Sequence, residues 1–209
     1  ASLTSTQVAS LESADLAVLS STQMRGLSTR GLAAMDSADL AALSSVQVAA
    51  LSSAQLRALE TNDLVGLGTT GLAGLSGAQI GTLTTAQLAA LGTDQLQSLN
   101  SAQITGLTSQ QLASLDTADL NMLTTAQFRA MSSAQVAALT SHQIGQLESA
   151  DLAALTTAQF KAIGAAAIGE IAEGGLLLVL FAIGHSLEEH AMGSARSAIK
   201  ALGSIAPRS

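Results

Sequence analysis

One eight-residue pattern of apolar and polar positions repeats about twenty times between Leu3 and Phe160. In the octad Leu43–Ala50, position 1 is Leu, positions 2 and 3 are Ser, position 5 is Gln and position 6 is apolar again. Other octads keep Leu or Met at position 1, a large apolar residue at position 6 and, usually, a small residue at position 8. A short fixed period predicts a repeat architecture, in which each unit buries its apolar side against its neighbours.

The octad cannot continue as one regular element. Eight residues advance a helix by about 80° beyond two full turns, so an apolar stripe would wind around the helix axis. In a strand, positions 1 and 6 would face opposite sides, because successive side chains alternate. The chain must therefore bend once in every octad.

The second half of the octad favours a short helix. Leu56 and Leu59 are three residues apart and would share one helical face. Ala, Gln and Leu are good helix formers, and the repeats contain no proline. Each helix is too short to be stable alone, so its stability must come from stacking.

The first half of the octad resembles a helix N-cap, and two registers of that cap are open. In one register Ser44 caps the helix, Gln47 reaches back to it and Leu43 packs onto Val48. In the other register Ser45 is the cap, because position 3 is Ser or Thr in every octad except the one with Gly77. Position 2 also accepts Glu, Asp, Gly and Asn.

These patterns predict an all-α solenoid of short N-capped helical octads over residues 1–162. The alternative is a β-solenoid, because Ser37–Leu40 (Ser-Ala-Asp-Leu) resembles the core of a pentapeptide-repeat coil. The period of eight and the many Ala and Gln residues favour helices over strands.

Composition changes near Ile163, where Thr, Gln and Asp become rare and an apolar stretch begins. We place a domain boundary there and predict a C-terminal apolar helical hairpin over residues 163–209, acting as a membrane anchor or as a cap of the solenoid. Residues 171–187 have a borderline length for a membrane span. Arg196 and Lys200 follow on one side, which suits a cytoplasmic flank. We expect a membrane-associated or cell-surface bacterial protein.

Several short phrases in the tail occur in a recognisable order: Gly164-Ala165-Ala166, Gly169-Glu170, Leu180-Phe181, Gly184-His185-Ser186-Leu187-Glu188, Ala191-Met192-Gly193 and Ala206-Pro207. With them, residues 164–207 resemble the transmembrane hairpin that precedes the actuator domain of heavy-metal-transporting P-type ATPases. The resemblance implies a segment that frames an ion path. The phosphorylated Asp motif, the nucleotide site and the Cys-Pro-Cys motif of that family are missing. A fragment or fusion of such a pump, without its catalytic parts, is therefore an alternative identity.

Composition excludes several function classes. The formal net charge is -7, so a nucleic acid backbone would be repelled. The chain has no Cys, Trp or Tyr and only three Phe, which leaves neither thiol chemistry nor the aromatic walls of most ligand sites. We therefore expect no enzyme activity, no catalytic or metal-binding residue and no cofactor.

Five octads pair an acid at position 2 with Asp at position 5: Glu12/Asp15, Asp36/Asp39, Glu60/Asp63, Asp116/Asp119 and Glu148/Asp151. The first three pairs are 24 residues apart and would align if one turn held three octads. Aligned carboxylates could hold Ca²⁺ through oxygen ligands. Capping and solubility are the favoured interpretation, because acids near a helix start interact well with its dipole.

The remaining charged residues suggest no site. Position 7 carries a cation in four octads, at Arg25, Arg57, Arg129 and Lys161, and we predict a solvated face there. His142 is predicted to lie at the surface. In the tail, His185 and Glu189 would share a helical face, but His190 lies about 140° away from His185 around the helix. These three residues therefore do not have the spacing of the metal ligands in a metalloprotease motif.

The sequence therefore predicts a non-enzymatic structural or interaction repeat protein. Its partner would be another protein or a second copy of itself, and long solenoids can join end to end into filaments. Membrane contact would occur through residues 171–187, and nucleic acid is not expected as a partner.

Overall fold

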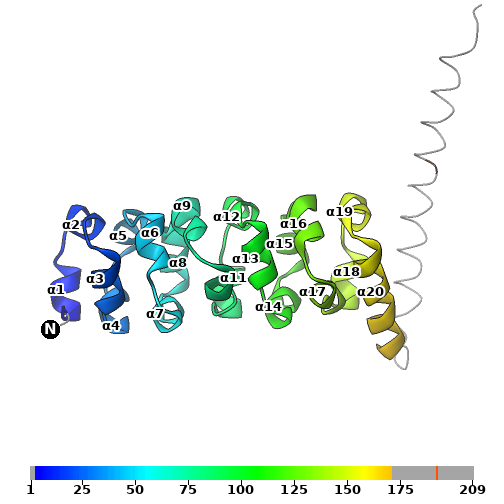
Figure 1. Ribbon diagram of the computed structural model, residues 1–209, viewed down its shortest axis with the longest axis horizontal. Helices are drawn as coiled ribbons and strands as arrows, with labels where there is room; N and C mark the ends of the chain where they lie inside the picture. Colours follow the sequence, from blue (N-terminus) through cyan, green and yellow to red (C-terminus); the bar gives the residue numbers. More distant parts are fainter. Residues whose placement is uncertain (1–2, 171–191, 193–209) are drawn as a thin grey trace, which may run out of the picture.

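The chain forms a rod of short helices that follow one another from α1 at one end to α20 at the other (Figure 1). The computed structural model describes residues 3–170 and residue 192. These residues contain twenty α-helices and no strand, so the helical solenoid is confirmed and the β-solenoid is wrong for this part of the chain. The helices are α1 (Ser5–Ala9), α2 (Ser13–Ala17), α3 (Ser21–Gly26), α4 (Thr29–Leu32), α5 (Ser37–Ala41), α6 (Ser45–Ala49), α7 (Ser53–Ala58), α8 (Thr61–Gly66), α9 (Gly68–Ala73), α10 (Gly77–Ile80), α11 (Thr85–Ala89), α12 (Thr93–Ser98), α13 (Ser101–Gly106), α14 (Ser109–Ser114), α15 (Thr117–Asn121), α16 (Thr125–Ala130), α17 (Ser133–Ala137), α18 (Ser141–Gly145), α19 (Ser149–Ala154) and α20 (Thr157–Glu170).

The N-cap lies at position 2 of the octad. Ser44 has extended backbone angles, and its hydroxyl accepts a hydrogen bond from the backbone N–H of Gln47 at 3.4 Å. The Gln47 side-chain oxygen in turn accepts from the backbone N–H of Ser44 at 2.8 Å. This reciprocal capping box confirms the register with Ser44 as cap. The register with Ser45 as cap is wrong, because Ser45 is the first residue of α6.

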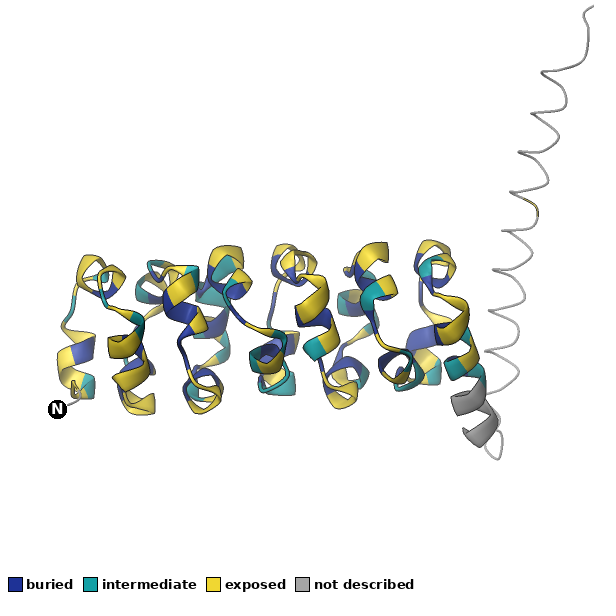
Figure 2. Ribbon diagram, in the orientation of Figure 1, coloured by how far each residue is buried: buried dark blue, intermediate teal, exposed yellow. Residues whose placement is uncertain are grey.

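The octads before α20 end in the predicted bend. At the end of α6, the backbone N–H of Leu51 donates to the carbonyl of Val48 at 3.1 Å, and Ser52 is extended again as the next cap. Leu43 and Val48 are buried, as the packing of position 1 onto position 6 predicts. Position 1 and position 6 residues together form one continuous core along the rod (Figure 2).

One turn of the coil holds between three and four octads. Most helices pack against the helix three octads later, as α10 does against α13 and α5 against α8. Gln47 in α6 also reaches back to Leu16 and Leu19, which lie 31 and 28 residues earlier, at the end of α2. A helix with such a glutamine, like α6, is therefore held by two helices of the neighbouring turn.

Gly68 is the one described residue whose backbone requires glycine. Its φ is +61°, in the left-handed region that side chains with a Cβ atom disfavour. It lies at position 2 of its octad, where other octads have an extended capping residue. The helices α8 and α9 consequently follow each other with only Leu67 between them.

The last described helix, α20, has 14 residues and packs against α17. It crosses the domain boundary that we placed between residues 162 and 163. Among residues 3–170, no helix is long and apolar enough to span a membrane. The predicted membrane contact at 171–187 and the His185, Glu189 and His190 group lie outside the described residues, as does the predicted apolar hairpin (163–209) except for residues 163–170 and 192.

Candidate functional site

The most distinctive polar feature is a row of buried glutamine amides between successive turns. The Gln103 side chain is 1% exposed, and its oxygen accepts from the backbone N–H of Asn100 at 2.9 Å. Its nitrogen donates to the carbonyls of Leu72 and Leu75, one turn earlier, at 2.7 and 2.8 Å. The same pair of donated bonds occurs at Gln47, Gln55, Gln87, Gln111, Gln127, Gln135, Gln143 and Gln159.

The oxygen and the nitrogen of each glutamine amide thus make different kinds of hydrogen bond. The oxygen closes the cap of its own helix, and the nitrogen satisfies two carbonyls at the end of a helix in the preceding turn. The capping role of the glutamine was predicted from the sequence, and its bonds to the preceding turn were not. One signal was available, because a capping box accepts Glu as well as Gln, yet no octad has Glu at position 5.

We expect Gln103→Glu to lower the free energy of unfolding by about 2 kcal/mol. The carboxylate keeps the acceptor for the cap, but it removes both donors and places a charge beside the carbonyls of Leu72 and Leu75. Chemical denaturation measures the change. Gln110→Glu, an exposed residue of α14, is the matched control and should alter stability by less than about 0.5 kcal/mol. Equal losses in the two variants would contradict the inter-turn role.

Asp151 occupies the glutamine position of α19 and is buried, with 4% of its surface exposed. Burial, together with the nearby Glu148 carboxylate, raises the pKa of Asp151 to about 6. The corresponding glutamines donate to carbonyls 31 and 28 residues earlier, which here are those of Leu120 and Leu123. An ionised carboxylate cannot donate there.

The buried carboxyl group of Asp151 should make the free energy of unfolding depend on pH. Because the folded-state pKa of Asp151 lies above its ordinary value of 3.8, the folded chain holds the proton more tightly than the unfolded chain. Stability should therefore fall as the pH rises from about 4 to about 6. Asp151→Gln should reduce this loss of stability and raise the free energy of unfolding by about 1 kcal/mol at pH 7.5. Denaturation at several pH values measures both effects, with the exposed Asp94→Asn as control. An unchanged fall in Asp151→Gln would refute the assignment.

The first three acid pairs lie on helices of successive turns, α2, α5 and α8. The Ser13 hydroxyl on α2 donates to Asp39 on α5 at 2.8 Å. Burial raises the pKa of Asp63 on α8, and the carboxylates of Glu60 and Asp36 add to that rise. The predicted alignment is therefore present. Among the described residues, however, no three His, Asp or Glu side chains group into a metal site, so the Ca²⁺ hypothesis has no ligand set there.

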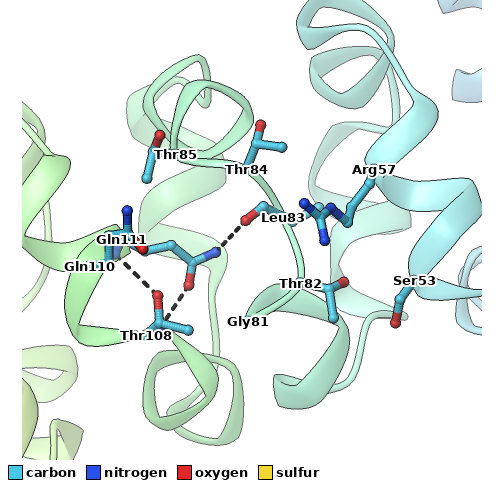
Figure 3. A pocket seen from close by; sticks show the side chains of 10 residues that line it. All are labelled: Ser53, Arg57, Gly81, Thr82, Leu83, Thr84, Thr85, Thr108, Gln110 and Gln111. Atoms are coloured by element: carbon cyan, nitrogen blue, oxygen red, sulfur yellow. Dashed lines mark hydrogen bonds between the residues drawn. The ribbon is translucent and has the colours of Figure 1, made fainter.

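A polar groove of about 440 Å³ is bounded by α7, by the segment that joins α10 to α11, and by α14 with its cap (Figure 3). Its walls are Ser53, Arg57, Gly81, Thr82, Leu83, Thr84, Thr85, Thr108, Gln110 and Gln111. Glycines allow α10 to pack closely against α13. A Cβ atom on Gly77 or Gly106 would overlap the backbone of the other helix. Between α7 and α10 there is no comparable contact.

The groove offers hydrogen bonds and one cation. The Thr82 hydroxyl donates to the carbonyl of Gln79 at 2.7 Å, whereas the hydroxyls of Thr84 and Thr108 accept backbone N–H groups of their own caps. Arg57 is exposed on the opposite wall. No His, Asp, Glu or Lys lines the groove, so it lacks a general base to activate a nucleophile.

The other predicted surface residues lie where expected. The four position 7 cations, Arg25, Arg57, Arg129 and Lys161, are all exposed. His142 is exposed in α18. These side chains are separated along the rod and do not converge on one site.

Comparison with known proteins identifies the repeat. The ALTTAQ repeat family matches six overlapping segments: residues 8–37, 32–61, 57–93, 85–117, 112–148 and 144–170. No curated protein and no solved structure matches the chain. The resemblance of residues 164–207 to heavy-metal-transporting ATPases finds no support in these comparisons. Because the six segments cover residues 8–170, well over half of its length, the chain belongs to the ALTTAQ repeat family.

Proposed function

We propose that this chain is a non-enzymatic structural or interaction repeat protein that acts through contacts between its own copies. The observation that carries the proposal is the row of inter-turn glutamine bonds. One side of each turn presents amide donors and the other side presents paired carbonyl acceptors. A turn built in this way is complementary to another turn of the same repeat.

The polar side chains support a structural role. Hydroxyls at position 2 accept bonds from their own helices, and most glutamines at position 5 join turns. The groove beside Arg57 has hydrogen-bonding walls without an acid or base. A structural rod requires no more chemistry than this.

Sedimentation equilibrium of the full chain tests the proposal. We expect the weight-average mass to rise reversibly with concentration over about a hundredfold range. A monomer at every concentration would contradict self-association. The same measurement in mild detergent separates association of the rod from association through the apolar tail, because only the latter should disappear.

Membrane contact through residues 171–187, and with it a membrane or cell-surface location, is part of the proposal. Flotation of the full chain with lipid vesicles tests it. Binding should be lost when Leu178 and Val179 are both replaced by Asp, since charges are costly in the apolar layer. Equal flotation of the two proteins would contradict membrane contact.

A further inference from the structure

We infer that the polar groove beside Arg57 binds a small molecule that carries a carboxylate or phosphate group. The groove has a volume of about 440 Å³, which lies within the range of small-molecule sites. Its walls come from α7, from the segment that joins α10 to α11 and from α14 with its cap (Figure 3). Binding there requires only one copy of the chain, so the inference goes beyond the proposed self-association.

The groove lies in the middle of the rod, beside an interruption in one row of helices. Along this row α1 packs against α4 and α4 against α7, and then α10 against α13, α13 against α16 and α16 against α19. Between α7 and α10 the described chain makes no comparable contact. Ser53 and Arg57 belong to α7, and Gly81 directly follows α10, so the groove borders this interruption. The recess is therefore formed by the packing of inner turns.

Arg57 gives the groove a positive charge that no acid in its walls neutralises. The Arg57 side chain is exposed and makes no ion pair or hydrogen bond with another described residue. No Asp or Glu lines the groove, although the whole chain has a formal net charge of -7. The planar N–H donors of a guanidinium match the paired oxygens of a carboxylate or phosphate. The charge of the groove therefore complements an oxyanion.

Two capping hydroxyls in the groove keep their hydrogens available. The Thr84 hydroxyl accepts the backbone N–H of Gln87 at 3.1 Å, and the Thr108 hydroxyl accepts in the same way at 3.1 Å. Neither hydroxyl donates its own hydrogen to a described residue. The Ser52 hydroxyl, by contrast, donates to the side-chain oxygen of its capping glutamine at 2.9 Å. Thr84 and Thr108 can therefore donate to a ligand without opening their caps.

The other groove walls favour a polar ligand. The side chains of Ser53, Thr85 and Gln110 make no hydrogen bond within the described part of the chain. The walls include one large apolar side chain, Leu83, which is buried, and no aromatic side chain. Most sites for apolar ligands have predominantly apolar and aromatic walls. The groove instead suits an oxyanion on a small polar body.

The test is a nuclear magnetic resonance titration of the full chain with inorganic phosphate and, separately, with citrate. Chloride at the same ionic strength is the reference. We expect saturable shifts of the backbone amides of Thr84, Thr85 and Gln110. The anion that binds more tightly identifies phosphate or carboxylate as the recognised group.

Arg57→Gln should weaken binding of that anion by at least about tenfold, because it removes charge-assisted hydrogen bonds. The matched control is Arg129→Gln. Arg129 is exposed at the same octad position of α16 and does not line the groove. The control should weaken binding by less than about twofold. Both variants should melt at the temperature of the parent chain, because both side chains lie outside the core.

Three results would overturn the inference. Shifts that do not saturate with either anion, or that chloride reproduces, would show that the groove has no oxyanion site. Binding that is unchanged in Arg57→Gln would place the site elsewhere. Equal weakening in Arg57→Gln and Arg129→Gln would show a general effect of charge. None of these results depends on whether copies of the chain associate, which sedimentation equilibrium measures separately.

Discussion

Replacing Phe128 by Ala should lower the free energy of unfolding by about 3–5 kcal/mol. Phe128 occupies position 6 of its octad in α16 and is completely buried, with 0% of its surface exposed. It is the largest fully buried side chain among the described residues. Truncation removes apolar area and leaves a cavity that short, mutually constrained helices cannot collapse to fill. Chemical denaturation monitored by circular dichroism measures the loss.

Two further variants serve as controls for the Phe128→Ala prediction. Phe128→Leu should cost less than about 1.5 kcal/mol, because Leu fills the same position in most octads. Val46→Ala should change stability by less than about 0.5 kcal/mol, since Val46 is 66% exposed. If Phe128→Ala and Val46→Ala had similar effects, position 6 would not form the core of the rod.

The same substitution at two glycines of one octad position should have opposite effects. Gly26 and Gly106 both occupy position 8. A Cβ atom on Gly106 would overlap the carbonyl oxygen of Gly77, whereas nothing lies within 4 Å of one on Gly26. We expect Gly106→Ala to cost about 3 kcal/mol, because backbone atoms of α10 and α13 must separate.

Gly26→Ala should instead raise the free energy of unfolding by about 0.5 kcal/mol, because alanine restricts the unfolded chain and favours the helix. Thermal melting of the two variants beside the parent chain gives the sign of each effect. Destabilisation by both substitutions would mean that the close approach of α10 and α13 is not what Gly106 provides.

The local structure of the octad follows from its sequence because it depends on neighbouring residues. Ser44 and Gln47 are three residues apart, which is the spacing of a capping box, and Leu43 and Val48 are placed to pack across it. These features predicted the helix, its start and its buried side. The strict Ser or Thr at position 3 was misleading, since it suggested a cap. In the structure Ser37 lies against Gly66 of the next turn, so position 3 is constrained by space.

The contacts between turns did not follow from the sequence, because they depend on how far the chain rotates at each bend. The sequence left the number of octads in a turn open. It therefore could not pair Gln103 with the carbonyls of Leu72 and Leu75, or Gly106 with Gly77. Small changes in the bend would bring different octads together with the same local structure.

A pair of cysteines tests the geometry of the turn most directly, because the chain has none of its own. A Cβ atom on Gly66 would lie 3.0 Å from that of Ser37. A separation larger by about 0.5 Å falls within the range of a disulfide, so a small outward shift of the two backbones allows the bond. Ser37→Cys/Gly66→Cys should therefore form an intramolecular disulfide on mild oxidation, as measured by thiol titration and intact mass. Ser37→Cys paired with Ala58→Cys or with Gly74→Cys, one octad to either side of Gly66, should keep both thiols. Efficient bonding in either of those pairs, or none between residues 37 and 66, would contradict a coil with between three and four octads in each turn.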